Sequence, residues 1–133
     1  EIANVTVKAK TFYTIENDGL MQLWPGRVFL NPPYAQPLIE QFINALADRV
    51  ESRQISQAVV LVNNATDTTW GQTLLGLASA VCFLRGRVRF LDAEGNASGA
   101  PLQGQMLIYI GEHGEAFADK CADLGWSVGC VHV

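Results

Sequence analysis

The chain has 133 residues, of which 49% are hydrophobic and 17% charged, and its formal net charge is -4. This length and balance are typical of one globular domain that buries most of its apolar surface. The acidic balance excludes the overall positive field of small non-specific DNA-binding proteins, so any contact with nucleic acid has to come from a local patch.

Neither a membrane segment nor a disulfide framework is expected. No apolar stretch approaches the roughly 20 residues of a membrane helix, and the first residues have no charged-then-apolar leader, so we expect a soluble, cytoplasmic protein. The cysteines Cys82, Cys121 and Cys130 are odd in number and have no CxxC spacing, which indicates reduced thiols. Together with His113 and His132 they fit no common zinc spacing, so no metal site is expected.

The first half of the chain alternates predicted strands and helices. The apolar run Arg27–Leu30 stops abruptly at Asn31-Pro32-Pro33, which predicts a buried strand that ends at a rigid loop. Residues 37–50 place apolar side chains at helical spacing, with polar residues on the other face, and predict an amphipathic helix. The continuous apolar run Ala58–Val62 predicts a strand covered on both faces, followed by a helix over residues 70–80. This order indicates an open α/β sheet.

The second half adds hairpin-like strands, which make the predicted sheet mixed. The expected elements are strands over 81–84, 88–91, 105–110 and 126–131, a glycine-rich loop over 92–101, and a helix over 115–124. Trp70 is expected to pack at the start of its helix.

Two polar loops follow predicted parallel strands. Asn31–Tyr34 comes after the first strand and Asn63–Thr69 after the second. Ligands of open α/β sheets bind beyond the carboxyl ends of the strands, so we expect both loops to lie on the same edge.

The residue types of Asn31–Tyr34 suit methylation of an exocyclic amine, whose lone pair is delocalised into its ring. Two acceptors on the amino hydrogens would localise that pair, and the Asn31 side-chain oxygen and the Pro32 carbonyl can supply them. Pro32 and Pro33 fix the backbone and remove competing amide hydrogens. Tyr34 offers a flat face for a flipped base, a contact worth about 1–3 kcal/mol. The alternative is that these four residues form an ordinary turn at the end of a strand, with no role in catalysis.

Asn31-Pro32-Pro33-Tyr34 matches the NPPY motif of the amino-methyltransferases. Residues 12–20, Trp24 and residues 64–70 resemble the phage-encoded DNA N6-adenine methyltransferases, and the resemblance covers nearly the whole chain. It implies a class I, Rossmann-like α/β methyltransferase fold. It also implies that the protein transfers a methyl group from S-adenosylmethionine to a flipped-out adenine at a specific site in DNA, inside a bacterial host cell.

The resemblance also assigns cofactor contacts. Asp18 stands where the superfamily places a residue that contacts the adenine of S-adenosylmethionine, although Asn-Asp-Gly is also a strong turn signal. Phe12 and Tyr13 either line the cofactor site or pack in the hydrophobic core, and Asn31 borders the cofactor site. Related enzymes carry a further strand and cofactor loop upstream. We therefore expect residues 1–133 to be one catalytic domain, the carboxyl-terminal portion of a longer chain, with an incomplete cofactor pocket.

Arg85, Arg87 and Arg89 alternate, so on a strand they would project from one face and contact DNA phosphates. The alternative is a solvent-exposed edge strand whose charges prevent it from pairing with another chain. Two other functions also stay open. One is a protein-glutamine methyltransferase, because a glutamine amide presents a similar amino group, and the other is a non-catalytic DNA-binding module.

Overall fold

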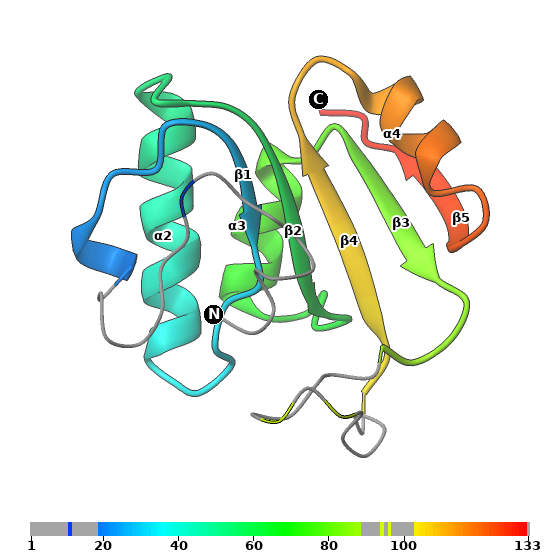
Figure 1. Cartoon of the computed structure of the whole chain (residues 1–133), viewed down its shortest axis with the longest axis horizontal. Coiled ribbons are helices and arrows are strands. Elements are labelled where there is room, and N and C mark those ends of the chain that lie inside the picture. Colours follow the sequence, from blue (N-terminus) through cyan, green and yellow to red (C-terminus); the bar gives the residue numbers. More distant parts are fainter. Residues whose placement is uncertain (1–10, 12–18, 89–93, 95, 97–102, 133) are drawn as a thin grey trace.

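The computed structural model describes residues 11, 19–88, 94, 96 and 103–132. Within them the strands form one mixed sheet in the order β1-β2-β4-β3-β5 (Figure 1). The elements are η1 (Gly19–Met21), β1 (Gly26–Leu30), α2 (Leu38–Glu51), β2 (Ile55–Asn63), α3 (Thr69–Leu77), β3 (Ala80–Leu84), β4 (Gln105–Ile110), α4 (Gly114–Lys120) and β5 (Gly125–Gly129). None of the described helices has the length and apolar character needed to cross a membrane.

Three strands run in the same direction. β1 pairs with β2 in parallel, and β4 is antiparallel to both β2 and β3. The carboxyl ends of β1, β2 and β3 therefore lie at one edge of the sheet, the lower edge in Figure 1, which we call the carboxyl edge. β5 adds an antiparallel strand beside β3, so the expectation of a mixed sheet is confirmed.

The helices cover both faces of the sheet, as alternation along β4 shows. Met106 and Ile108 belong to the core cluster that contains the buried side chains of α2 and α3. Tyr109 points to the opposite face and stacks on Phe117 of α4, with ring centroids 5.1 Å apart. Alternate residues of a strand face opposite sides, so Gln105 lies on the same face as Tyr109.

The amphipathic helix predicted over 37–50 is α2. Ile39, Ile43 and Leu46 recur at helical spacing, and each is at most 1% exposed. The helix begins one residue later than expected, after Pro37, and ends at Glu51.

Several predicted boundaries were wrong, and β2 begins at Ile55, three residues before the predicted run Ala58–Val62. The second helix ends at Leu77 because the backbone N–H of Ser79 donates to the carbonyl of Tyr109, which begins the approach to β3. The third predicted helix, α4, ends at Lys120, and the Cys121 carbonyl then accepts hydrogen bonds from the next turn. The closing strand ends at Gly129, after which the N–H of Cys130 donates to the carbonyl of Ser79.

The strand predicted over 88–91 is also not confirmed. β3 ends at Leu84, and residues 85–88 form a connection rather than a strand. The remaining residues of that prediction lie outside the described residues, as does most of the expected glycine-rich loop.

The segment before β1 is held to α2 by one arginine. The Arg49 guanidinium donates to the carbonyls of Leu20 and Gln22, at 3.2 and 3.0 Å, and lies 4.3 Å from the centroid of the Trp24 ring. The indole N–H of Trp24 donates in turn to the Gly19 carbonyl at 2.8 Å. Charged hydrogen bonds and a cation–π contact therefore add to the stacking of Trp24 on Phe42 of α2, whose ring centroids lie 6.1 Å apart.

We expect Arg49→Met to lower the free energy of unfolding by about 1–2 kcal/mol, because methionine retains the packing but removes the donors and the cation. Urea unfolding of the variant beside wild type measures the loss. Arg27→Met is the control, since Arg27 is an exposed arginine of β1. An equal loss of stability in both variants would show that the hydrogen bonds and cation–π contact of Arg49 contribute nothing to the free energy of unfolding.

Candidate active site

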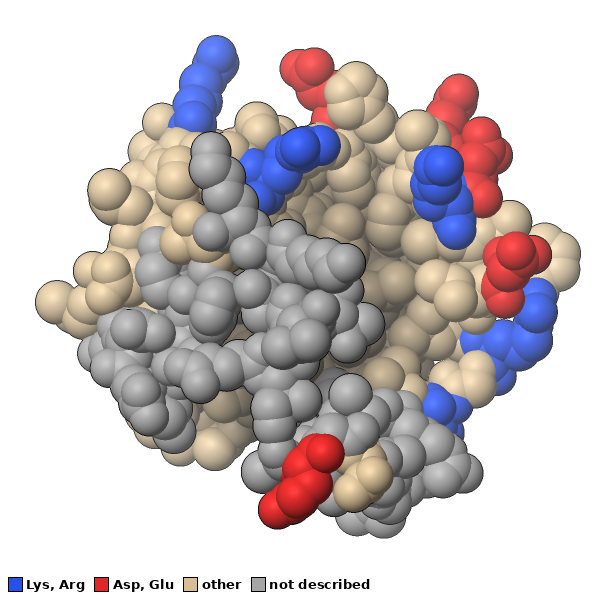
Figure 2. Space-filling model, in the orientation of Figure 1, with Lys and Arg blue, Asp and Glu red and all other residues tan. Residues whose placement is uncertain are grey.

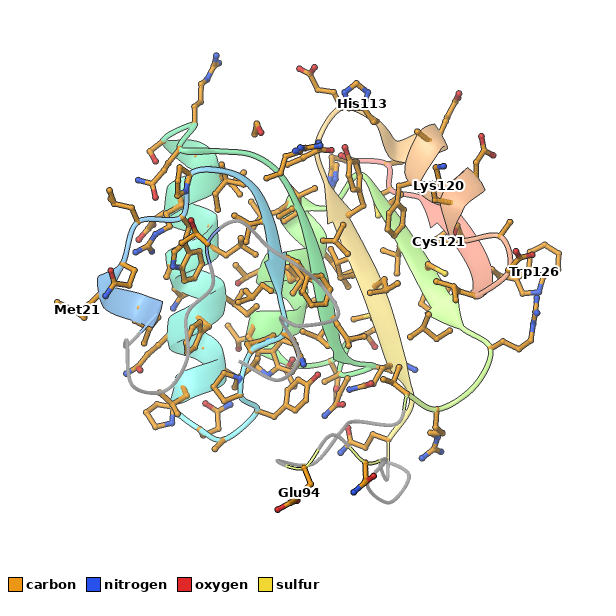
Figure 3. All side chains as sticks on the ribbon, in the orientation of Figure 1. Met21, Glu94, His113, Lys120, Cys121 and Trp126 are labelled. Atoms are coloured by element: carbon orange, nitrogen blue, oxygen red, sulfur yellow. The ribbon has the colours of Figure 1, made fainter. Side chains whose placement is uncertain are left out.

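The carboxyl edge brings together three loops that are far apart in the sequence. Residues 31–34 follow β1, residues 64–68 follow β2, and residues 85–88 follow β3. The expectation that the first two loops share an edge is confirmed. Figure 3 shows Glu94 beyond this lower edge, with His113 at the opposite one.

The four motif residues differ in burial. Pro32 is buried and anchors the loop, whereas Asn31 and Pro33 are exposed. Tyr34 is half-buried and packs against the core cluster. The loop therefore presents the Asn31 amide to solvent directly beyond the end of β1.

The Tyr34 hydroxyl is bonded into the sheet. It donates to the Leu61 carbonyl of β2 at 3.3 Å and accepts from Nε2 of Gln105 at 3.0 Å. The same Gln105 nitrogen donates to Oδ1 of Asn63 at 3.2 Å, so one amide joins the motif loop to the end of β2. Burial raises the pKa of Tyr34, and the hydrogen bond from Gln105 opposes this rise.

Sequence reasoning missed Gln105. It stands at the first position of an otherwise apolar strand, and its backbone pairs with Asn63. A polar side chain at the start of an apolar run could have indicated a functional residue. Only the pairing register shows that Gln105 lies opposite Asn63 and near Tyr34.

The loop after β2 is closed by the start of α3. Thr68 caps this helix: its hydroxyl accepts from the N–H of Gly71 at 3.0 Å and donates to the Ala65 carbonyl at 2.7 Å. Trp70 is 7% exposed and belongs to the core cluster, which confirms its expected packing role.

Arg85 and Arg87 are exposed at the carboxyl edge, but they do not alternate along a strand as expected. The N–H of Arg85 donates to the Leu124 carbonyl at 2.8 Å, and its Nη1 lies 3.5 Å from the Asp123 carbonyl, so Arg85 lies beside the segment before β5, one position beyond the Leu84–Gly125 pair. Arg89 lies outside the described residues. Figure 2 shows basic and acidic side chains interspersed along the right side of this face rather than a uniform basic surface.

The expected cofactor contacts Phe12, Tyr13 and Asp18 lie outside the described residues. Of the cofactor set, Asn31 is described.

The cysteines are free thiols, and burial together with neighbouring Cys82 raises the pKa of Cys121 to about 11. A thiol with that pKa is protonated near neutrality and is a poor nucleophile. Figure 3 shows Cys121 beside the sheet, whereas Trp126 lies at its outer end. Among the described residues, no group of three or more His, Cys, Asp or Glu is placed to hold a metal ion.

Comparison with protein-family models matches residues 3–118 to DNA N-6-adenine-methyltransferase (Dam). The chain belongs to the Dam family. Searches of curated proteins and of solved structures gave no significant match. The Dam match includes the motif loop, the loop after β2, the basic connection and Gln105. The resemblance to DNA adenine methyltransferases is thereby confirmed.

Proposed function

We propose that this Dam-family protein transfers a methyl group from S-adenosylmethionine to N6 of an adenine flipped out of DNA, at a specific site, on a class I methyltransferase fold. The observation that carries the proposal is the placement of Asn31-Pro32-Pro33-Tyr34 at the carboxyl edge, with the Asn31 amide exposed. The parallel β1-α2-β2 unit and the mixed sheet support the fold assignment.

In this proposal the motif loop prepares the target amine. The Asn31 side-chain oxygen and the Pro32 carbonyl accept the two amino hydrogens, which localises the nitrogen lone pair for attack. Burial of Pro32 fixes the loop, and Tyr34, tethered through its hydroxyl, provides the surface on which the flipped base stacks.

S-adenosylmethionine supplies an electrophilic methyl group when bound. We propose that Phe12, Tyr13, Asp18 and Asn31 contact it. The exposed amide of Asn31, directly after β1, fits a polar group that approaches from the carboxyl edge.

Methyl transfer from labelled S-adenosylmethionine tests the proposal. The substrates are duplex DNA, the same DNA with every adenine N6-methylated in advance, and a glutamine-containing protein. We expect label only in the unmodified DNA, recovered as N6-methyladenine after digestion. Label in the protein would identify a glutamine methyltransferase, and DNA binding without transfer would identify a non-catalytic module. Membership of the Dam family favours the DNA substrate.

We propose that Arg85, Arg87 and Arg89 contact DNA phosphates beside this site. The double variant Arg85→Gln and Arg87→Gln should reduce the slope of log affinity against log salt by about two units, one for each lost phosphate contact. Fluorescence anisotropy over a salt series measures the slope.

The matched control is Arg53→Gln, because Arg53 is exposed and precedes β2 at the opposite edge of the sheet. Its slope should equal that of wild type. If the double variant also keeps the wild-type slope, the two arginines are surface charges without a DNA contact.

A further inference from the structure

Gln105 is a polar side chain in the interior of the protein. It is 1% exposed, and it precedes the fully buried Met106 in a strand whose other residues are apolar. A glutamine at such a position has to find hydrogen-bond partners within the protein, because water cannot reach it.

Its partners are both residues of the carboxyl edge. Nε2 donates to the Tyr34 hydroxyl at 3.0 Å and to Oδ1 of Asn63 at 3.2 Å. The two N–H groups of this amide are therefore used to join the motif loop to the end of β2.

The oxygen of the same amide has no hydrogen-bond partner in the part of the chain that the structure describes. No described donor reaches Oε1 of Gln105, and that atom is buried. A buried acceptor without a partner destabilises the folded state, whereas methionine, of similar length, would fill the position without such a group. Stability therefore does not explain the glutamine, and its two bonds at the candidate active site do.

We propose that Gln105 is a positioning residue that holds the ring of Tyr34 at the orientation in which the flipped adenine stacks on it. The inference rests on the proposed function and extends it to a residue outside the motif loop. With the Tyr34 hydroxyl bonded to both Gln105 and the Leu61 carbonyl, rotation of the side chain about its Cα–Cβ bond would break two hydrogen bonds.

We expect this arrangement to raise kcat without changing the affinity for S-adenosylmethionine. A ring that is already oriented aligns the base with the reacting methyl group, and a misplacement of about 1 Å costs on the order of a hundredfold in rate. The residue does not contact the cofactor in this proposal, so cofactor affinity should not depend on it.

The test compares Gln105→Met, Tyr34→Phe and the double variant. We expect Gln105→Met to lower kcat at least about tenfold, with KM for S-adenosylmethionine within about twofold of wild type. Tyr34→Phe keeps the ring but removes the hydroxyl. In that background Gln105→Met should have little further effect, because Gln105 acts through the hydroxyl. Additive losses in the double variant would overturn the inference.

The matched control is Gln57→Met. Gln57 is also a strand glutamine bonded to a tyrosine hydroxyl, that of Tyr109 at 2.7 Å, but this pair lies near the opposite edge. We expect Gln57→Met to leave kcat unchanged. Gln105→Met should unfold in urea at a midpoint no lower than that of wild type, whereas a purely structural glutamine would lower it.

A signal independent of activity separates the inference from the proposed function. The chain has three tyrosines, so labelling at the ring carbon that bears the hydroxyl gives three carbon-13 resonances, and Tyr34→Phe identifies one of them. In Gln105→Met the Tyr34 resonance should shift while the other two remain. An active wild type with an unshifted Tyr34 signal would overturn the inference alone. A full-length wild type that transfers no methyl group would overturn the proposed function, and with it the positioning role.

Discussion

Asn31→Ala is expected to fold like wild type and to lose about a hundredfold or more in kcat, because it removes an acceptor whose interaction strengthens only as the amine reacts. Asn31 is exposed, so its side chain contributes little to the core. KM for the DNA substrate should stay within about twofold of wild type, since a contact made in the transition state affects turnover. Single-turnover methyl transfer with saturating DNA measures the effect.

Two further variants sharpen this expectation. Asn31→Asp retains an oxygen acceptor at the same place and should keep more activity than Asn31→Ala. Asn44→Ala removes an exposed asparagine of α2 and should behave like wild type. Near-normal turnover in Asn31→Ala would show that the amide does not contact the target amine.

Local patterns in the sequence predicted much of the fold. Residues 38–51 form a helix because their apolar side chains repeat at helical spacing, and residues 105–110 form a strand because their apolar run is short and bounded. The parallel orientation of β1 and β2 then predicted that the two polar loops lie at one edge of the sheet, and the Tyr34–Leu61 hydrogen bond joins the first loop to β2 near the end of that strand.

Features that depend on pairing between distant residues could not be predicted in this way. The N–H of Arg85 donates to the Leu124 carbonyl, one position beyond the Leu84–Gly125 pair of β3 and β5, and no local pattern reveals a partner 39 positions away in the chain. Gln105 was counted as one more residue of a strand, since its role depends on the register that places it opposite Asn63. The site is thus specified partly by a motif and partly by tertiary contacts.

Gly71 is another residue whose importance depends on contacts that the sequence pattern does not reveal, and it is buried at the start of α3. A Cβ there would overlap the Ala65 carbonyl oxygen and lie 2.8 Å from Oγ1 of Thr68. Since both atoms belong to the turn that caps α3, the loop after β2 cannot yield without breaking that cap. We expect Gly71→Ala to lower the free energy of unfolding by about 3 kcal/mol, the upper end of the usual cost of overpacking.

Gly76 provides the matched control, because it lies in the same helix and a Cβ there meets nothing within 4 Å. Gly76→Ala should raise the free energy of unfolding by about 0.5–1 kcal/mol, the usual gain from replacing a helical glycine. Urea unfolding of both variants measures this difference in sign. If Gly71→Ala were as stable as Gly76→Ala, the turn at Ala65 would be able to move away, and the hydrogen bonds of Thr68 to Ala65 and Gly71 would not hold the loop after β2 in place.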